Sequence, residues 1–244
     1  MCTLVVAQGV FPGYPVVVAA NRDERLDRPA APPRLWPGPV PFVAPQDLVA
    51  GGSWLGLNAR GMFVGITNRF GAPVDKAKKS RGEIVLQALA APGAAALHRQ
   101  WADFPGAEYN PFHLLYADAS GTFVTWFDGA RLQQAALGSG VHIVTERSLG
   151  GDDRARTERV RAAWKAVDVS GSPPVDVLQA MLRLHEPADP LGGTCVHLPE
   201  FNYGTRSSLV LLIAAQLKDS RWFWAEGAPG HAPFQEHPEW IKAL

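Results

Sequence analysis

The chain begins CTLVVAQ (residues 2–8), continues through PGYP (12–15) and then reads VVVAANRDE (16–24). The two apolar runs are typical of β-strands, and the link rich in Gly and Pro between them predicts a hairpin. The second strand ends in the polar and charged cluster Asn21-Arg22-Asp23-Glu24. In such a hairpin the start of the first strand lies beside the end of the second, so the sequence predicts that the Cys2 thiol lies near this polar cluster.

Cys2 follows the initiator Met1, so removal of Met1 would leave a thiol and a free α-amino group on one residue. The amine has an unperturbed pKa of about 8 and the thiol one of about 8.5, so the amine can accept the proton that the thiol must lose. In the alternative interpretation, Cys2 is a small buried hydrophobe that begins a strand. Asn68 ends a further apolar run, and several strand ends that offer polar groups to one thiol favour a site.

The remaining patterns predict paired strands and amphipathic helices in one domain that spans residues 1–244. Residues 26–45 contain too many prolines for regular structure and predict a long surface loop. Further hairpins are expected over 53–68, 113–127 and 131–144, helices over 80–89, 94–101, 152–167 and 175–185, and strands over 207–214 and 221–225. This order favours an α+β fold in which helices cover antiparallel sheets.

Composition excludes several classes of function. Lys plus Arg and Asp plus Glu both number 23, and this balance argues against a nucleic-acid partner. No targeting segment or apolar run long enough to span a membrane is evident, so we expect a cytoplasmic protein. The two cysteines, Cys2 and Cys195, do not form a disulfide framework. Cys195-Val196-His197 is a weak metal signal because no second ligand pair accompanies it, and we expect no metal site.

Six segments carry a resemblance to a known family: Cys2, residues 21–24, Gly51 to Asn58, Ile66-Thr67-Asn68, Ser80-Arg81-Gly82-Glu83 and Tyr203 to Ser208. In these motifs and their order the chain resembles the NRDE family, the transport and Golgi organisation protein 2-like proteins. That family is similar to the cysteine type of N-terminal-nucleophile (Ntn) hydrolase, such as penicillin V acylases and bile salt hydrolases. The resemblance implies an αββα sandwich, with two antiparallel sheets between helical layers.

The resemblance also implies catalytic roles for four residues. Cys2 matches the nucleophile and Asp23 the carboxylate that holds its amine. Asn68 matches an oxyanion donor, and Arg206 an arginine that steadies the site. Each also has a plain structural interpretation, as a surface ion pair, a turn cap or a strand-end ion pair.

Four further residues are expected to support the site: Asn21, Arg22, Glu24 and Glu146. The hydrolases have their arginine directly before the residue that matches Asn21, where this chain has Ala20. This displacement of the arginine to Arg22 is expected to turn its side chain to the opposite face of the strand. Glu146 falls near the position of a second asparagine, and a carboxylate there would repel an oxyanion.

Two functions remain open. One is an enzyme in which Cys2 attacks an amide or thioester carbonyl of a small-molecule acyl substrate, without a required cofactor. The other is a carrier that binds haem or an acyl lipid without chemistry, in keeping with the links of the resembled family to haem trafficking and lipid metabolism. For haem, the available ligand types are Cys2, Cys195 and His197.

Overall fold

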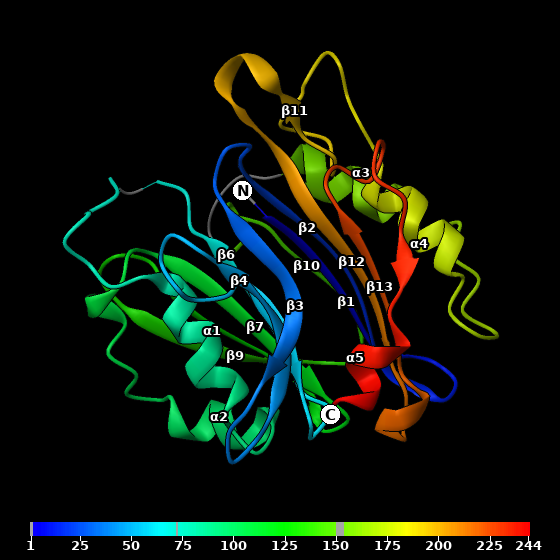
Figure 1. The fold of residues 1–244 in the computed structure, drawn as a ribbon, viewed down its shortest axis with the longest axis horizontal. Coiled ribbons are helices and arrows are strands. Elements are labelled where there is room, and N and C mark those ends of the chain that lie inside the picture. The colour runs from blue at the N-terminus through cyan, green and yellow to red at the C-terminus, as the bar shows by residue number, and fades with distance from the viewer. Residues whose placement is uncertain (1, 72, 150–153) are drawn as a thin grey trace.

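Two antiparallel sheets stack face to face in the computed structural model, which describes residues 2–71, 73–149 and 154–244. Helices α1 (Arg81–Leu89) and α2 (Ala94–Gln100) pack on one sheet, and α3 (Arg154–Trp164) and α4 (Val175–Leu182) pack on the side of the other (Figure 1). The predicted α+β sandwich is therefore confirmed. No helix among the described residues is long and apolar enough to cross a membrane.

Each sheet has seven strands within the described part of the chain. The first sheet has the spatial order β10 (Gly140–Val144), β1 (Cys2–Phe11), β2 (Tyr14–Arg25), β12 (Tyr203–Ile213), β13 (Arg221–Glu226) and β14 (Gln235–Glu236), with β11 (His197–Leu198) also paired to β12. The second sheet runs β3 (Ala30–Trp36), β4 (Phe42–Asp47), β5 (Leu55–Asn58), β6 (Phe63–Asn68), β7 (Phe112–Asp118), β8 (Gly121–Phe127) and β9 (Leu132–Leu137).

The central strands of the first sheet are buried on both faces, which explains why their apolar runs are continuous. Leu4 and Ala20 belong to the core between the sheets, whereas Val5 and Ala19 pack toward α4 in the core on the helical side. Because side chains alternate along a strand, Cys2 continues the face of Leu4 toward the second sheet. This alternation decides which polar residues can meet at the strand ends.

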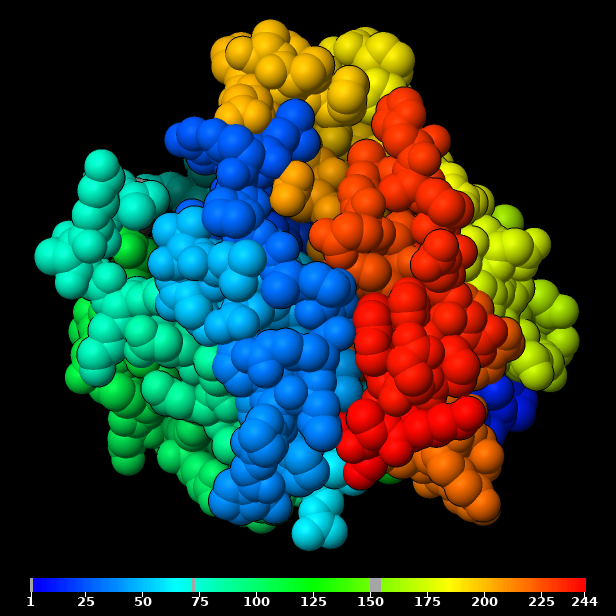
Figure 2. All heavy atoms as spheres, in the orientation of Figure 1, coloured from blue at the N-terminus to red at the C-terminus, as the bar shows by residue number. Residues whose placement is uncertain are grey.

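The first hairpin, β1–β2, is confirmed, as are β5–β6 and β7–β8. The loop predicted over residues 26–45 is wrong, because β3 and most of β4 lie there. β3 is an edge strand, and Pro32 and Pro33 fall in an irregularity of its register between Ala31 and Arg34. At such positions a missing N–H disturbs no ladder, so prolines are tolerated. The C-terminal segment with α5 (Pro238–Lys242) packs beside β3 (Figure 2).

The hairpin predicted over residues 131–144 is also wrong. β9 pairs with β8 in the second sheet, whereas β10 pairs with β1 in the first. The two-residue link Gly138-Ser139 joins them, so the chain crosses between the sheets at this point. A short link rich in glycine can form either a hairpin or such a crossover. Here β10 pairs with the edge of β1 and not with β9.

Helix α1 is held by backbone contact at its first turn. Ser80 is the N-cap, and its Oγ accepts a hydrogen bond of 3.2 Å from the Gly82 N–H. The Gly82 carbonyl in turn accepts from the Ser53 N–H at 3.2 Å. A Cβ on Gly52 would lie 2.6 Å from the Gly82 Cα, so only glycine permits this approach. The Gly52–Gly82 contact thereby places the start of α1 against the segment after β4.

We expect Gly52→Ala to destabilise the protein by about 1–3 kcal/mol, because the new methyl group must displace the backbone of α1. Gly138→Ala is the matched control, since a Cβ there meets nothing within 4 Å, and its effect should stay within about 0.5 kcal/mol. Urea unfolding of the two variants measures the difference. Equal stabilities would contradict the proposed contact.

Candidate active site

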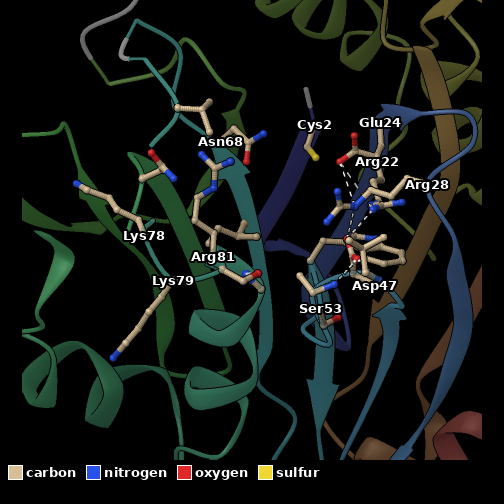
Figure 3. A pocket seen from close by; sticks show the side chains of 18 of the residues that line it. Cys2, Arg22, Glu24, Arg28, Asp47, Ser53, Asn68, Lys78, Lys79 and Arg81 are labelled. Carbon is tan, nitrogen blue, oxygen red and sulfur yellow. Dashed lines mark hydrogen bonds and ion pairs between the residues drawn. The ribbon is translucent and has the colours of Figure 1, made fainter. Parts of the chain in front are cut away.

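A cavity of about 640 Å³ opens at the N-terminal end of β1. Cys2 lines it, together with residues from the end of β2, the segment 47–54, the end of β6 and the segment 74–82. Figure 3 shows two walls. We call them the Arg22 wall, formed by Arg22, Glu24, Arg28, Asp47 and Trp54, and the Arg81 wall, formed by Asn68, Lys78, Lys79 and Arg81.

Arg22 lies directly opposite Cys2 in the β1–β2 register. Side chains of paired residues in an antiparallel sheet share a face, so the Arg22 guanidinium lies on the same side as the thiol. The expectation that Arg22 turns away from the site is therefore wrong, because positions 20 and 22 are two residues apart and share one face of β2. Arg22 is 5% exposed, and its guanidinium lies 4.0 Å from the centre of the Trp54 ring. Arg22 is thus the residue of β2 that pairs with Cys2.

Asp47 fixes the charges of the Arg22 wall. Its Oδ2 accepts hydrogen bonds from Arg28 at 2.6 Å and from Arg22 at 3.3 Å, and its Oδ1 accepts from the N–H groups of Val49 and Ala50. Burial alone would raise the pKa of Asp47, but Arg28 and these N–H groups outweigh burial and lower the pKa. Asp47 therefore stays ionised and holds both guanidinium groups in place.

The groups around Cys2 shift the pKa of its thiol in opposite directions. Burial raises the pKa of the Cys2 thiol, and the Asp23 carboxylate acts in the same direction. Arg22 and a hydrogen bond with the Asp23 backbone oppose this rise without reversing it, so the pKa of the thiol stays raised. Burial likewise lowers the pKa of Arg22, while Cys2, Glu24 and Asp47 counteract it. A thiolate at Cys2 thus depends on nearby positive charge to offset burial.

Asn21 belongs to the opposite face of β2. Its Nδ2 donates to the carbonyls of Leu182 and Thr194 at 2.9 and 2.7 Å, which ties β2 to the end of α4 and to the segment that precedes β11. Asp23 also lines the cavity but is anchored from the helical side. Its Oδ1 accepts from the Thr205 hydroxyl at 2.7 Å.

Arg156 connects Asp23 with Glu146. Its Nη1 lies 3.7 Å from the Asp23 Oδ2 and 3.7 Å from the Glu146 Oε2, and it donates to the Thr3 hydroxyl at 3.2 Å. Burial raises the pKa of Asp23, and Arg156 opposes that rise. Glu146 does not line the cavity. The carboxylate expected to repel an oxyanion is therefore neutralised by a guanidinium on the helical side of the sheet.

Arg156 was not among the predicted site residues, although its place in the helix pattern marks it as buried. It lies four residues before Val160, and the two side chains are 1% and 0% exposed. Residues four apart share one face of a helix, so Arg156 is an arginine within the buried stripe of α3. A charge in such a stripe requires buried partners, which Asp23 and Glu146 provide.

Asn68 ends β6 and is exposed to the cavity, on the Arg81 wall (Figure 3). The strand end is held by His113, whose Nδ1 lies 3.0 Å from the Thr67 hydroxyl and whose Nε2 lies 2.8 Å from Arg69. Burial and Arg69 lower the pKa of His113 to about 4, so the imidazole is neutral near pH 7. Asn68 thus faces Cys2 across the opening from a fixed strand end.

Arg206 and Glu24, which were also predicted as site residues, differ in whether they reach the cavity. Arg206 does not line the cavity, and its guanidinium donates to the carbonyls of Leu26 and Arg28 at 2.6 and 3.3 Å. Glu24 lines the cavity, and its Oε2 lies 3.9 Å from both Arg22 and Arg28. Arg206 therefore supports the segment that carries Arg28, whereas Glu24 adds negative charge to the Arg22 wall.

Cys195 and His197 lie outside the cavity. Cys195 is buried, and burial raises the pKa of its thiol. His197 is exposed, with its ring 5.8 Å from that of His231. No group of three potential metal ligands occurs in the described part of the chain.

Three solved structures superimpose on this chain with TM-scores above 0.5. Penicillin V acylase from Agrobacterium tumefaciens superimposes with a TM-score of 0.56 and 16% identity, over 93% of this chain and 83% of its own. A mutant conjugated bile acid hydrolase from Clostridium perfringens gives 0.53 and 10%, over 97% and 96%. The N-acylethanolamine-hydrolyzing acid amidase ortholog of Caenorhabditis elegans gives 0.51 and 12%, over 86% and 92%. At these identities the likeness establishes an Ntn-hydrolase-like fold.

Relatives by sequence carry a different name. The Transport and Golgi organization protein 2 homolog of Homo sapiens is 27% identical over 260 residues, which cover 95% of this chain and 89% of the relative. The Bos taurus homolog is 27% identical over 231 residues, 83% of each chain. The sequence profile of the family described as Transport and Golgi organisation 2 matches residues 1–223. With its motifs in order and nearly its whole length matched, the chain belongs to the Transport and Golgi organisation 2 family.

Proposed function

We propose that this protein is an N-terminal-cysteine acyl-transfer enzyme that cleaves an amide or thioester bond of a small acyl compound. The observation that carries the proposal is the position of Cys2, whose thiol lines a cavity and lies directly across from Arg22. The positive charge of Arg22 favours the reactive thiolate and counteracts burial, which raises the pKa of the thiol, so the proposed reaction also needs a base to accept the proton. The size of the cavity is within the range of small-molecule sites.

The proposed reaction begins after Met1 is removed. The Cys2 Sγ attacks the carbonyl carbon, and the α-amine of Cys2 accepts the thiol proton. Asn68 donates a hydrogen bond to the oxyanion as the carbonyl becomes tetrahedral. The ammonium then returns the proton to the departing amine or thiol, and the C–N or C–S bond breaks. Water, deprotonated by the same amine, hydrolyses the acyl-Cys2 thioester and restores the thiol.

The surrounding residues position these groups. Asp23 orients the α-amine, and its own carboxylate is held by Thr205 and Arg156. Asn21 anchors β2 from the helical side, and Arg206 supports the segment that carries Arg28. Within this proposal Arg206 is a positioning residue because it does not line the cavity.

The apolar part of the cavity fits an acyl chain. Trp54 and Ile66 line its interior, while Val49 and Val74 line it with 62% and 70% of their surfaces exposed. Exposed apolar side chains at the mouth of a cavity are typical of a surface that a ligand covers. The free thiols of Cys2 and Cys195 fit a reducing compartment, and we place the activity in the cytoplasm.

A carrier for an acyl lipid or haem is the second candidate, because the same apolar lining would hold a ligand without chemistry. Of the three groups considered as haem ligands, Cys2 lines the cavity whereas Cys195 and His197 do not. A lipid fits this arrangement better than haem. The two functions differ in whether binding requires Cys2.

The first test is acylation of the chain. We expect a panel of N-acyl amides and acyl thioesters to leave an acyl group on Cys2, in protein whose intact mass lacks Met1. Peptide mapping locates the adduct, and Cys2→Ala is the matched control. Brief alkylation should likewise modify Cys2 and spare buried Cys195. Homogeneous retention of Met1 would contradict the amine as base, and saturable lipid binding unaffected by Cys2→Ala, without any adduct, would support the carrier.

Asn68→Asp should slow acylation by about 10²–10³ because it removes the oxyanion donor without changing the size of the side chain. Single-turnover mass spectrometry measures the rate of adduct formation. Asn110→Asp serves as a control, since its amide lines the same cavity but already bonds the Asp75 backbone. Equal effects of the two substitutions would show that Asn68 has no special role.

Asp23→Asn should keep the fold and abolish most Cys2 reactivity, because Asn can still accept from Thr205 while Glu146 remains beside Arg156.

Arg156→Met should instead destabilise the folded protein by about 3–5 kcal/mol, since two buried carboxylates lose their guanidinium. Removing the guanidinium raises the pKa of Asp23 in the folded state further above its value in the unfolded state. The folded state then binds more protons than the unfolded state, so the free energy of unfolding falls as pH rises. The destabilisation by Arg156→Met should therefore be greater at about pH 8 than at about pH 5.

Urea unfolding at both pH values and alkylation of folded protein measure these effects. If Asp23→Asn unfolds the protein while reactivity per folded molecule is unchanged, Asp23 has only a structural role. If Arg156→Met loses the same stability at both pH values, the carboxylates do not depend on that guanidinium.

A further inference from the structure

The two walls of the cavity differ in how their positive charges are balanced. On the Arg22 wall, Asp47 binds both Arg22 and Arg28, and Glu24 lies 3.9 Å from each. Two carboxylates thus accompany two guanidinium groups, so that wall carries little net charge. Any excess charge in the cavity must come from elsewhere.

The Arg81 wall has an excess of positive charge. Lys79 pairs with Glu108 and is thereby balanced. Arg81 and Lys78 take part in no ion pair among the described residues. Arg81 donates to the Pro111 carbonyl at 3.0 Å, and Lys78 donates to the Tyr109 carbonyl at 3.3 Å. Neighbouring Lys76 adds a third cation, whereas Asp75 is the one carboxylate that the segment 74–82 contributes to the lining.

Arg81 is held where a ligand can reach it. It is the first residue of α1, whose start is fixed by the Gly52–Gly82 contact, and it is partly buried in the wall. Its guanidinium uses Nη1 for the Pro111 carbonyl, which leaves other N–H donors of the fork for a ligand. Burial lowers the pKa of Arg81, and Cys2 and Glu24 oppose that effect, in keeping with a guanidinium near the thiol.

From this arrangement we propose that Arg81, assisted by Lys78, binds an anionic group of the acyl ligand, a carboxylate or a phosphate monoester. The planar guanidinium fork matches such oxyanions with two parallel hydrogen bonds. The acyl chain lies along Val49, Ile66 and Trp54, and the ligand is therefore an anionic amphiphile. The inference deepens the proposed function and rests on it only for the chemistry at Cys2, because binding can be measured without that thiol.

The test compares N-octanoylglycine with N-octanoylglycinamide, which differ in the negative charge, on the Cys2→Ala chain by titration calorimetry. We expect the acid to bind about 10- to 100-fold more tightly, as hydrogen bonds to charged groups allow. Adding Arg81→Gln should remove that preference and leave the affinity of the amide unchanged. Lys79→Gln is the matched control and should keep the preference, since Lys79 is already paired. N-octanoylethanolamine phosphate as a third probe decides between carboxylate and phosphate.

Several results would overturn the inference: no preference for either charged probe, a preference that survives Arg81→Gln, or loss of acid and amide binding by equal factors. Thermal melting of Arg81→Gln and rescue of binding by Arg81→Lys separate these results from misfolding. Failure of the proposed function has a distinct signature. In that case the acid binds in an Arg81-dependent manner, but wild-type Cys2 never carries the octanoyl group.

Discussion

The antiparallel register of β1 and β2 is the constraint on which the site depends. It sets Cys2 opposite Arg22 and Thr3 opposite Asn21, so each face of the first sheet receives one set of polar side chains. A shift by one residue would exchange the two sets. The register is secured by apolar side chains on both faces, because Leu4 and Ala20 are buried between the sheets while Val5 and Ala19 are buried under the helices.

Two charged clusters follow from this division, one on each face of the sheet. Toward the cavity, Asp47 holds Arg22 and Arg28. Toward α3, Arg156 lies between Asp23 and Glu146. In each cluster opposite charges accompany one another, which limits the cost of removing them from water. The cavity is consequently flanked by groups whose positions are fixed before any ligand enters.

This organisation reconciles the membership of the chain in the Transport and Golgi organisation 2 family with a fold shared by Ntn hydrolases. A fold alone does not establish a reaction, so function must be argued from the site. Here the site combines a thiol, a cross-strand guanidinium, an amide at the end of β6 and an apolar lining. That combination supports the proposed acyl chemistry, and the unbalanced charge of the Arg81 wall supports the proposed anionic ligand.

Much of the fold was predictable because strand pairing near a turn and helix capping depend on neighbours in the chain. The runs that became β1 and β2, the Ser80 cap and the alternating strands around residues 120–121 all follow from local spacing and turn chemistry. The prolines of residues 26–45 predicted a loop where β3 and β4 form, because their effect depends on whether a strand lies at the edge of a sheet. The sequence also singled out Cys2, as the residue in which a thiol and a terminal amine would coincide.

The tertiary structure alone decided which distant residues and strands lie together. Arg156 meets Asp23 across more than a hundred residues of chain, and Arg206 turns to the carbonyls of residues 26 and 28 and away from the cavity. β9 and β10 separate into different sheets although a short link joins them. Such outcomes depend on which distant surfaces pack together, whereas a residue pattern records only the preferences of each segment for its own conformation and burial.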